Sequence, residues 1–203
     1  MKIKKAVKKL FKHFSLPIAD AKGFTLIEIG IVLAIVGIII AGAIIKGPQL
    51  IASAKNKNLV KQYQSLTAAI YGYQEKYNYL PGDDLLATTH LAGTGATVVN
   101  GNGDGQILES LAANEHLASG EFITGSYNGT SDNMRHPYGG NVLIIYQLLQ
   151  GKTGNLIRFD GLSAEVAQYM DSAIDDGVYN TGSCRASAAY TAGTIITNLG
   201  CFF

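Results

Sequence analysis

A single carboxylate lies inside a long apolar segment near the N-terminus of this chain of 203 residues. Glu28 is the one charged residue between Phe24 and Ile45, and the segment directly follows Lys22 and Gly23. A segment of about 22 residues forms an α-helix long enough to cross a hydrocarbon core of about 30 Å. Because a carboxylate at mid-membrane costs about 2.5–3.5 kcal/mol, we expect Glu28 to have a function and a partner.

A second candidate site is a loop with oxygen-bearing residues spaced as in a calcium loop, which takes ligands at positions 1, 3, 5, 7, 9 and 12. The candidate calcium ligands are Asn100, Asn102, Asp104, Gln106 and Glu109. The first half fits, with Gly105 at position 6, but the required bidentate Glu at position 12 is replaced by Leu111. We favour a pair of Asn-Gly and Asp-Gly turns. The alternative is a structural calcium ion completed by Glu109 or Glu115.

The chain contains two cysteines, Cys184 and Cys201, both near its C-terminus. In a compartment outside the cytoplasm they would form one disulfide. A loop of this length gives a disulfide worth roughly 3 kcal/mol on the chain-entropy model.

Enzyme motifs are incomplete in this sequence. Gly151-Lys152-Thr153 ends like a P-loop, but Tyr146 stands where the first glycine is required. The four histidines do not have zinc-ligand spacing. Asn128-Gly129-Thr130 matches a glycosylation sequon by pattern only. We therefore expect a protein that is not an enzyme and has no cofactor apart from the calcium alternative.

The charge is unevenly distributed, although the net charge is only +1. The lysines that precede the apolar segment are Lys2, Lys4, Lys5, Lys8, Lys9, Lys12 and Lys22. They predict that the N-terminus is cytoplasmic and that the chain after the apolar segment lies outside. The apolar residues between these lysines have helical spacing, which indicates either an amphipathic helix on the membrane or a solvated leader. The remaining chain is net acidic, so no nucleic-acid contact is expected.

One long helix must position Glu28. Its pattern runs from about Phe24 to about Tyr77, with an expected bend at Gly47-Pro48 and an end at Leu80-Pro81-Gly82. Its second half carries an apolar stripe for packing on a head, formed by Leu59, Tyr63, Leu66, Ile70, Tyr73 and Tyr77.

The rest of the chain predicts a small α+β head. We expect a helix over Ser110–Ala118 and two strands, Asn141–Leu149 and Leu156–Phe159, joined by a turn over Gly151–Gly154. A helix that includes Leu162 and is capped by Ser163 ends at Asp175-Asp176-Gly177, and a further β-like run covers Thr194–Thr197. The predicted divisions are a leader (1–23), a transmembrane helix (24–45), a helix continuation (46–79) and a globular head (80–203).

The stretch Lys22-Gly23-Phe24-Thr25-Leu26-Ile27-Glu28 resembles the cleavage and methylation motif of type IV prepilins and of the pseudopilins of type II secretion. This resemblance implies that a prepilin peptidase cuts after Gly23 and methylates the new amino terminus of Phe24, and that the apolar helix is kept. It implies an assembly role for Glu28, and the helix glycine of the family falls on Gly37. It also implies an antiparallel sheet against the long helix and a disulfide-closed C-terminal loop.

The pairing of charges gives a physical reason for the amine at Phe24 and the carboxylate at Glu28. Methylation leaves the positive charge of an amine in place. The Phe24 amine of a neighbouring subunit could therefore neutralise Glu28 and set the axial register of an assembly. The alternative is a Glu28 that reaches the cytoplasmic interface from an ordinary signal anchor. Cleavage as a secretory signal at Ala41-Gly42-Ala43 is disfavoured, since the apolar segment is too long for one.

The resemblance implies a structural subunit of a type IV pilus-like filament. The implied partners are copies of itself, other pilins, the prepilin peptidase, an inner-membrane platform and an assembly ATPase that acts indirectly. The implied location is the bacterial inner membrane, with a single span, and then a filament at the cell surface. The alternatives are a pseudopilin of type II secretion and, from another class, a signal-anchored periplasmic binding or enzymatic domain.

Overall fold

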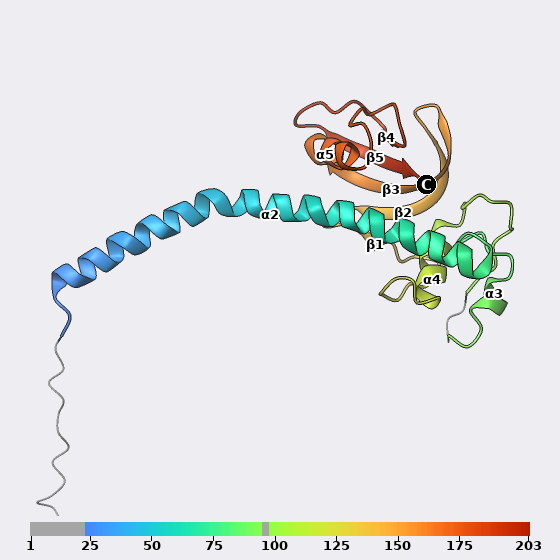
Figure 1. The fold of residues 1–203 in the computed structure, drawn as a ribbon, viewed down its shortest axis with the longest axis horizontal. Coiled ribbons are helices and arrows are strands. Elements are labelled where there is room, and N and C mark those ends of the chain that lie inside the picture. The colour runs from blue at the N-terminus through green and yellow to red at the C-terminus, as the bar shows by residue number, and fades with distance from the viewer. Residues whose placement is uncertain (1–22, 95–97) are drawn as a thin grey trace, which may run out of the picture. The chain divides into compact units, whose positions relative to one another are not determined.

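A computed structural model describes residues 23–94 and 98–203 of the chain, so the leader before Gly23, with its two alternatives of an amphipathic helix and a solvated segment, lies outside the described residues. The fold is α+β, as predicted (Figure 1). Its elements are α2 (Leu26–Tyr77), α3 (Ala87–His90), α4 (Ser110–Ser119), β1 (Met134–Arg135), β2 (Asn141–Leu149), β3 (Lys152–Ser163), α5 (Ala164–Ile174), β4 (Cys184–Ala186) and β5 (Ile195–Phe202). The chain divides into two units between Pro48 and Gln49.

The first unit contains the N-terminal half of α2. Its large aliphatic side chains are exposed, among them Leu26 at 95% and Ile38 at 75%. Isoleucine and valine are only moderate helix formers in water, but an apolar environment forces a backbone to satisfy its hydrogen bonds internally. The helix continues through Pro48 to Tyr77, so the predicted long helix is confirmed. The bend expected at Gly47-Pro48 stays a prediction.

In the second unit, the C-terminal half of α2 buries one face. The buried residues recur at helical spacing and are Leu59, Leu66, Ala69, Ile70 and Tyr73. Tyr63 and Tyr77 are partly buried beside them, which confirms the predicted stripe. The chain leaves the helix through Asn78, whose φ of 60° lies in the left-handed region.

A five-stranded antiparallel sheet packs against this face, with the strand order β1-β2-β3-β5-β4. Alternate residues of its strands enter the core, because successive side chains of a strand point to opposite faces. The inward residues include Val142, Ile144, Ile157, Phe159 and Leu199. On the other face, Leu149, Leu156 and Phe202 form a smaller cluster.

The predicted turn between β2 and β3 was wrong. Leu149 pairs with Lys152, so the turn consists of Gln150 and Gly151, with φ of 47° and 77°. Both values are positive, as a tight two-residue hairpin requires. Gly154, which we placed in the turn, lies within β3, where an added Cβ would stand 3.3 Å from the Phe202 ring.

Two strands are longer than predicted. β3 spans Lys152–Ser163 instead of Leu156–Phe159, and β5 spans Ile195–Phe202 instead of Thr194–Thr197. Leu162, which we assigned to the following helix, pairs with Ile196 in the sheet. Pairing between β3 and β5 holds residues in the extended conformation although their own sequence has little strand preference.

Two helices of the head, α4 and α5, were predicted, whereas the short helix α3 was not. α4 begins at Ser110, as expected, and ends at Ser119. Ser163 caps α5, because its hydroxyl accepts a hydrogen bond from the backbone N–H of Val166 at 3.5 Å.

Candidate functional site

The first turn of α2 holds Glu28 in a reciprocal pair with Thr25. The backbone N–H and the hydroxyl of Thr25 both donate to Oε2 of Glu28, each at 2.8 Å. In return, the Glu28 N–H donates to the Thr25 hydroxyl at 3.2 Å. This is a capping box, in which a Thr before the helix and a Glu three residues later satisfy free backbone donors. The Thr-x-x-Glu signal is present in the sequence, but our prediction for Glu28 concerned its charge and its role in assembly and not a helix cap.

The surface around this capping box is apolar and open. Phe24 is 82% exposed and Ile27 is 70% exposed. A shallow hollow on the helix is lined by Phe24, Glu28, Ile29, Ile31 and Val32. A partner for this surface must offer apolar contact and a positive charge. Gly23 is also exposed, and a Cβ added there would meet nothing within 4 Å among the described residues.

The candidate calcium loop surrounds a carboxylate of the chain itself. Asp83 is 2% exposed. Its Oδ1 accepts hydrogen bonds from the backbone N–H groups of Gly103 at 2.7 Å and Asp104 at 3.1 Å, and its Oδ2 accepts from Gly105 at 2.7 Å. Successive backbone N–H groups in such loops form a nest for an anion. We did not predict this role for Asp83.

Three of the side chains predicted as calcium ligands make hydrogen bonds within the protein. Asn100 Oδ1 accepts from the Thr88 N–H at 2.9 Å, and Asp104 Oδ1 accepts from the Gln106 N–H at 2.8 Å. Asn102 Nδ2 donates to Asp104 Oδ2 at 3.0 Å. The bond from the Gln106 N–H to Asp104, two residues earlier, is an Asx turn of the kind that Asn and Asp favour.

Glu109 and Glu115, the two residues proposed to complete the calcium site, have different surroundings. Glu109 directly precedes α4 and makes no side-chain cap bond there. Glu115 is 3% exposed and lies against Gly129, where an added Cβ would stand 2.1 Å from its Oε2. Burial raises the pKa of the Glu115 carboxyl. Calcium binding by this loop stays the alternative to the turns that we favoured.

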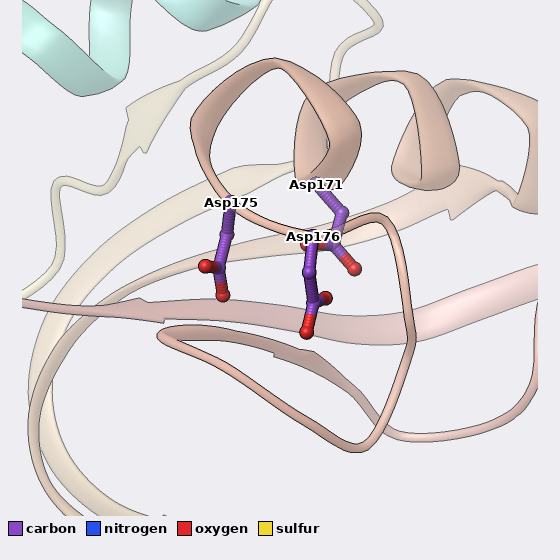
Figure 2. Close-up of side chains that lie close together, drawn as sticks. All are labelled: Asp171, Asp175 and Asp176. Carbon is purple, nitrogen blue, oxygen red and sulfur yellow. The ribbon is translucent and has the colours of Figure 1, made fainter.

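Three aspartates gather at the C-terminal end of α5, where we had not predicted a site. The carboxylate oxygens of Asp171, Asp175 and Asp176 lie within 4.8 Å of one another (Figure 2). Asp171 accepts from the Tyr190 hydroxyl at 2.7 Å, and Asp176 accepts from the Thr181 hydroxyl at 2.6 Å. The pKa values of Asp171 and Asp176 are shifted in opposite directions.

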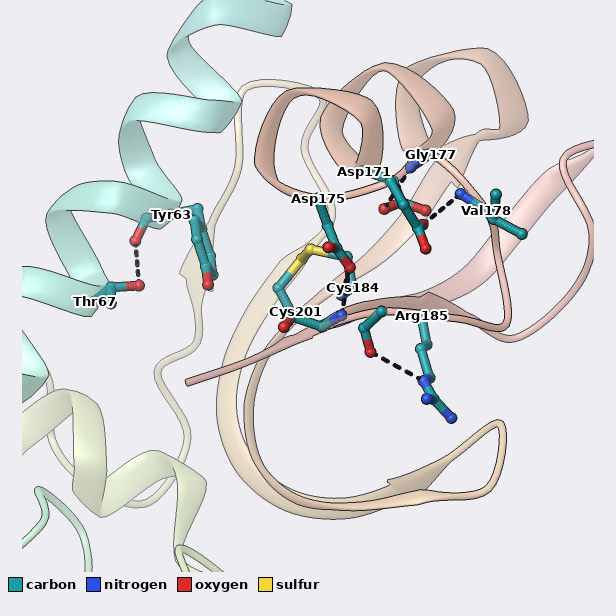
Figure 3. The surroundings of a disulfide bond; sticks show 12 residues. Tyr63, Thr67, Asp171, Asp175, Gly177, Val178, Cys184, Arg185 and Cys201 are labelled. Atoms are coloured by element: carbon teal, nitrogen blue, oxygen red, sulfur yellow. Dashed lines mark hydrogen bonds between the residues drawn. A yellow bond between two sulfur atoms is a disulfide. The ribbon is translucent and has the colours of Figure 1, made fainter.

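Burial raises the pKa of Asp171, whereas hydrogen bonds from the Thr181 hydroxyl and the Val178 N–H lower the pKa of Asp176. Asp175 Oδ2 accepts the backbone N–H groups of Ser183 and Cys184 (Figure 3). The three carboxylates therefore organise the loop that leads to Cys184.

The predicted disulfide is present (Figure 3). Cys184 and Cys201 face each other across β4 and β5, with their Cα atoms 4.0 Å apart. Both are fully buried against the core. The disulfide joins the edge strand β4 to β5 and closes the loop between Cys184 and Cys201.

The histidines of the head are engaged in the fold. His116 is fully buried. Its Nδ1 accepts the Gly82 N–H at 3.0 Å, which assigns the proton to Nε2, and Nε2 donates to the Val99 carbonyl at 2.8 Å. Burial lowers the pKa of His116. His90 lies 2.8 Å from Asp84, which also accepts the Tyr73 hydroxyl.

One comparison with known proteins gives a match. A family described as "Prokaryotic N-terminal methylation motif" matches residues 18–44, which include Gly23, Phe24 and Glu28. No curated protein and no solved structure matches the chain. Within the described residues, α2 is the one helix long and apolar enough to cross a membrane. The family match confirms the resemblance seen in residues 22–28.

Proposed function

We propose that this protein is the structural subunit of a type IV pilus-like filament. The chain is pilin-like or pseudopilin-like, since it carries the N-terminal methylation motif on which a prepilin peptidase acts. In our proposal the peptidase cuts between Gly23 and Phe24 and methylates the Phe24 amine. The observation that carries the proposal is the position of this motif, at the start of a helix whose apolar first half is exposed.

The exposed half of α2 needs an apolar environment in every state of the protein. Burying one Leu, Ile or Val side chain is worth about 1.5–3 kcal/mol. Before assembly, the lipid core supplies that environment. A helix that leaves the membrane must bury the same side chains against other helices, so the filament core is a bundle of these segments.

Glu28 has two tasks in this proposal. Its Oε2 closes the capping box with Thr25. Its Oε1 accepts no hydrogen bond from the described residues, and it is available to the Phe24 amine of a neighbouring subunit. Pairing with that amine would neutralise the carboxylate and fix the axial position of one subunit against the next.

The proposed partners are copies of the chain, other pilins, the prepilin peptidase and an inner-membrane assembly platform. The proposed location is the inner membrane, with the N-terminus in the cytoplasm, followed by a surface filament. We propose no enzymatic activity for the head, because the enzyme motifs of the sequence are incomplete, and no cofactor apart from the calcium alternative.

A pseudopilin of type II secretion is the second candidate within the same class. The loop around Asn100 to Glu109 favours it if that loop takes calcium, whereas the C-terminal disulfide favours a pilin. Recovery of the protein in sheared surface fibres would support a pilus. Retention in the envelope, with a secretion defect on deletion, would support a pseudopilin.

The N-terminus of the full chain, expressed with and without a prepilin peptidase, tests the proposal. We expect an N-terminus at Phe24 with the mass of one added methyl group, and only when the peptidase is present. A Gly23→Val variant should stay uncut, whereas Gly30→Val, at another exposed glycine of the motif region, should be cut normally. A chain that begins after Ala43 or keeps Met1 would instead indicate a signal-anchored domain.

A further inference from the structure

The second half of α2 has a polar face opposite to the face that packs on the sheet. Its residues recur at steps of three and four and are all exposed: Lys57, Lys61, Gln64, Ala68, Tyr71 and Glu75. We call this face the outer stripe. The residues buried against the head, such as Leu59, Leu66 and Ile70, lie on the other side of the helix.

The two ends of the outer stripe carry opposite charges. Lys57 and Lys61 are one helical turn apart, and like charges at this spacing repel each other. Neither lysine makes an ion pair or a hydrogen bond with any described residue, and neither does Glu75. Two other lysines of the second half of α2 contact aromatic rings. The Nζ of Lys55 lies 5.3 Å from the centroid of the Tyr138 ring, and the Nζ of Lys76 lies 4.8 Å from that of Tyr77.

The part of the outer stripe next to Glu75 is suited to close contact. Ala68 is small enough to let another helix approach. Tyr71 is 50% exposed, and its ring is braced edge-on by Phe203, with the centroids 6.3 Å apart. An exposed and braced aromatic ring between two charged ends is a typical anchor of a protein interface.

We propose that the C-terminal end of the outer stripe of one subunit, around Tyr71 and Glu75, binds the N-terminal end of the outer stripe of a second copy, around Lys57 and Lys61. The inference rests on the proposed function, because it needs copies that assemble. Two copies that are each anchored in the membrane by their own apolar segment have parallel α2 helices. A parallel pair without axial displacement would place lysines against lysines, so the charges require a displacement.

Fourteen to eighteen residues separate the lysines from Glu75, which corresponds to about 21–27 Å at a rise of ~1.5 Å per residue. A contact of this kind joins different patches of the two copies, so it repeats without closing and builds a filament. The contact between Glu28 and a neighbour's Phe24 amine implies a displacement of only about 6 Å. The two contacts therefore join a subunit to different neighbours.

Cysteine cross-linking tests the neighbour relationship directly. One full-length chain carries Lys61→Cys, a second chain with a different tag carries Glu75→Cys, and both are expressed with the processing and assembly machinery. The native cysteines are already paired in a buried disulfide. Oxidation should give a dimer that contains one chain of each kind. Lys61→Cys with Asp132→Cys, at an exposed aspartate outside the stripe, should give none.

A charge exchange shows whether the partner is a second copy. We expect Lys61→Glu or Glu75→Lys alone to lower the fibre yield about fivefold, and the double variant to restore it. Asp132→Lys should leave the yield unchanged. Fibres that form without the mixed dimer, or a double variant no better than the single ones, would overturn the outer-stripe contact alone. If the unmodified, correctly cut chain makes no fibre, the proposed function fails with it.

Discussion

Thr25 and Glu28 are joined by three hydrogen bonds across the first turn of α2: the Thr25 N–H and hydroxyl both donate to the carboxylate, and the Glu28 N–H donates to the hydroxyl. The carboxylate that costs most to place in a membrane is thus also the residue that caps the helix. Capping and charge pairing make different demands on residue 28, because a capping box accepts Glu or Gln, whereas an ion pair needs the charge.

Substitutions at Glu28 should separate these two roles. Glu28→Gln keeps the cap and removes the charge, and Glu28→Ala removes both. We expect both variants to be cut after Gly23 and both to fail in assembly, measured as sheared fibres. Only Glu28→Ala and Thr25→Ala should loosen the first turn, by about 0.5–2 kcal/mol in the amide hydrogen exchange of residues 26–29. Normal fibres from Glu28→Gln would refute the charge pairing.

Removal of the disulfide should destabilise the head. The Cys184→Ser and Cys201→Ser double variant loses the constraint between residues separated by 17 positions. We expect a loss of roughly 3 kcal/mol on the chain-entropy model. The measurement is thermal unfolding of the full chain in detergent, where a reductant should lower the melting temperature of the natural chain and leave that of the variant unchanged. Equal melting temperatures of the two chains would contradict the prediction.

Acid should weaken the head through His116. Its pKa is lowered in the folded protein by burial, and the unfolded chain has a pKa of about 6.5. The unfolded state therefore takes up the proton first as the pH falls. The stability contribution of neutral His116 is complete above about pH 6.5 and is lost progressively below it. His116→Gln should flatten the melting temperature between pH 7 and 5, and an unchanged slope in that variant would argue against this role.

The loop around Asp83 should depend on that carboxylate and not on calcium. Asp83→Asn weakens three hydrogen bonds from backbone N–H groups, and a loss of about 1.5–3 kcal/mol is expected from one charge-assisted bond alone. Millimolar calcium should leave the melting temperature of the natural chain unchanged. A rise with calcium that disappears in Asp104→Ala would instead place the ion in the loop.

Several features of the candidate site could be predicted from the sequence. Gly23, Phe24 and Glu28 form a local pattern, and their family match depends on nothing beyond residues 18–44. The disulfide followed from the presence of two cysteines. By contrast, Asp83 was missed because its binding site consists of backbone N–H groups some twenty residues later, which have no signal in the side chains.

The sequence by itself determined the long helix, the apolar segment and the motif, because helical hydrogen bonds and apolar periodicity are local properties. Only the tertiary structure decided the lengths of β3 and β5, the short strands β1 and β4, and the two-residue turn at Gln150. A strand obtains its hydrogen bonds from residues distant in the chain, so pairing with β5 fixed where β3 ends. The face of α2 that packs on the head was predicted from its apolar periodicity, but the contact that braces the exposed Tyr71 against Phe203 needed the structure, because the two residues are far apart in the chain.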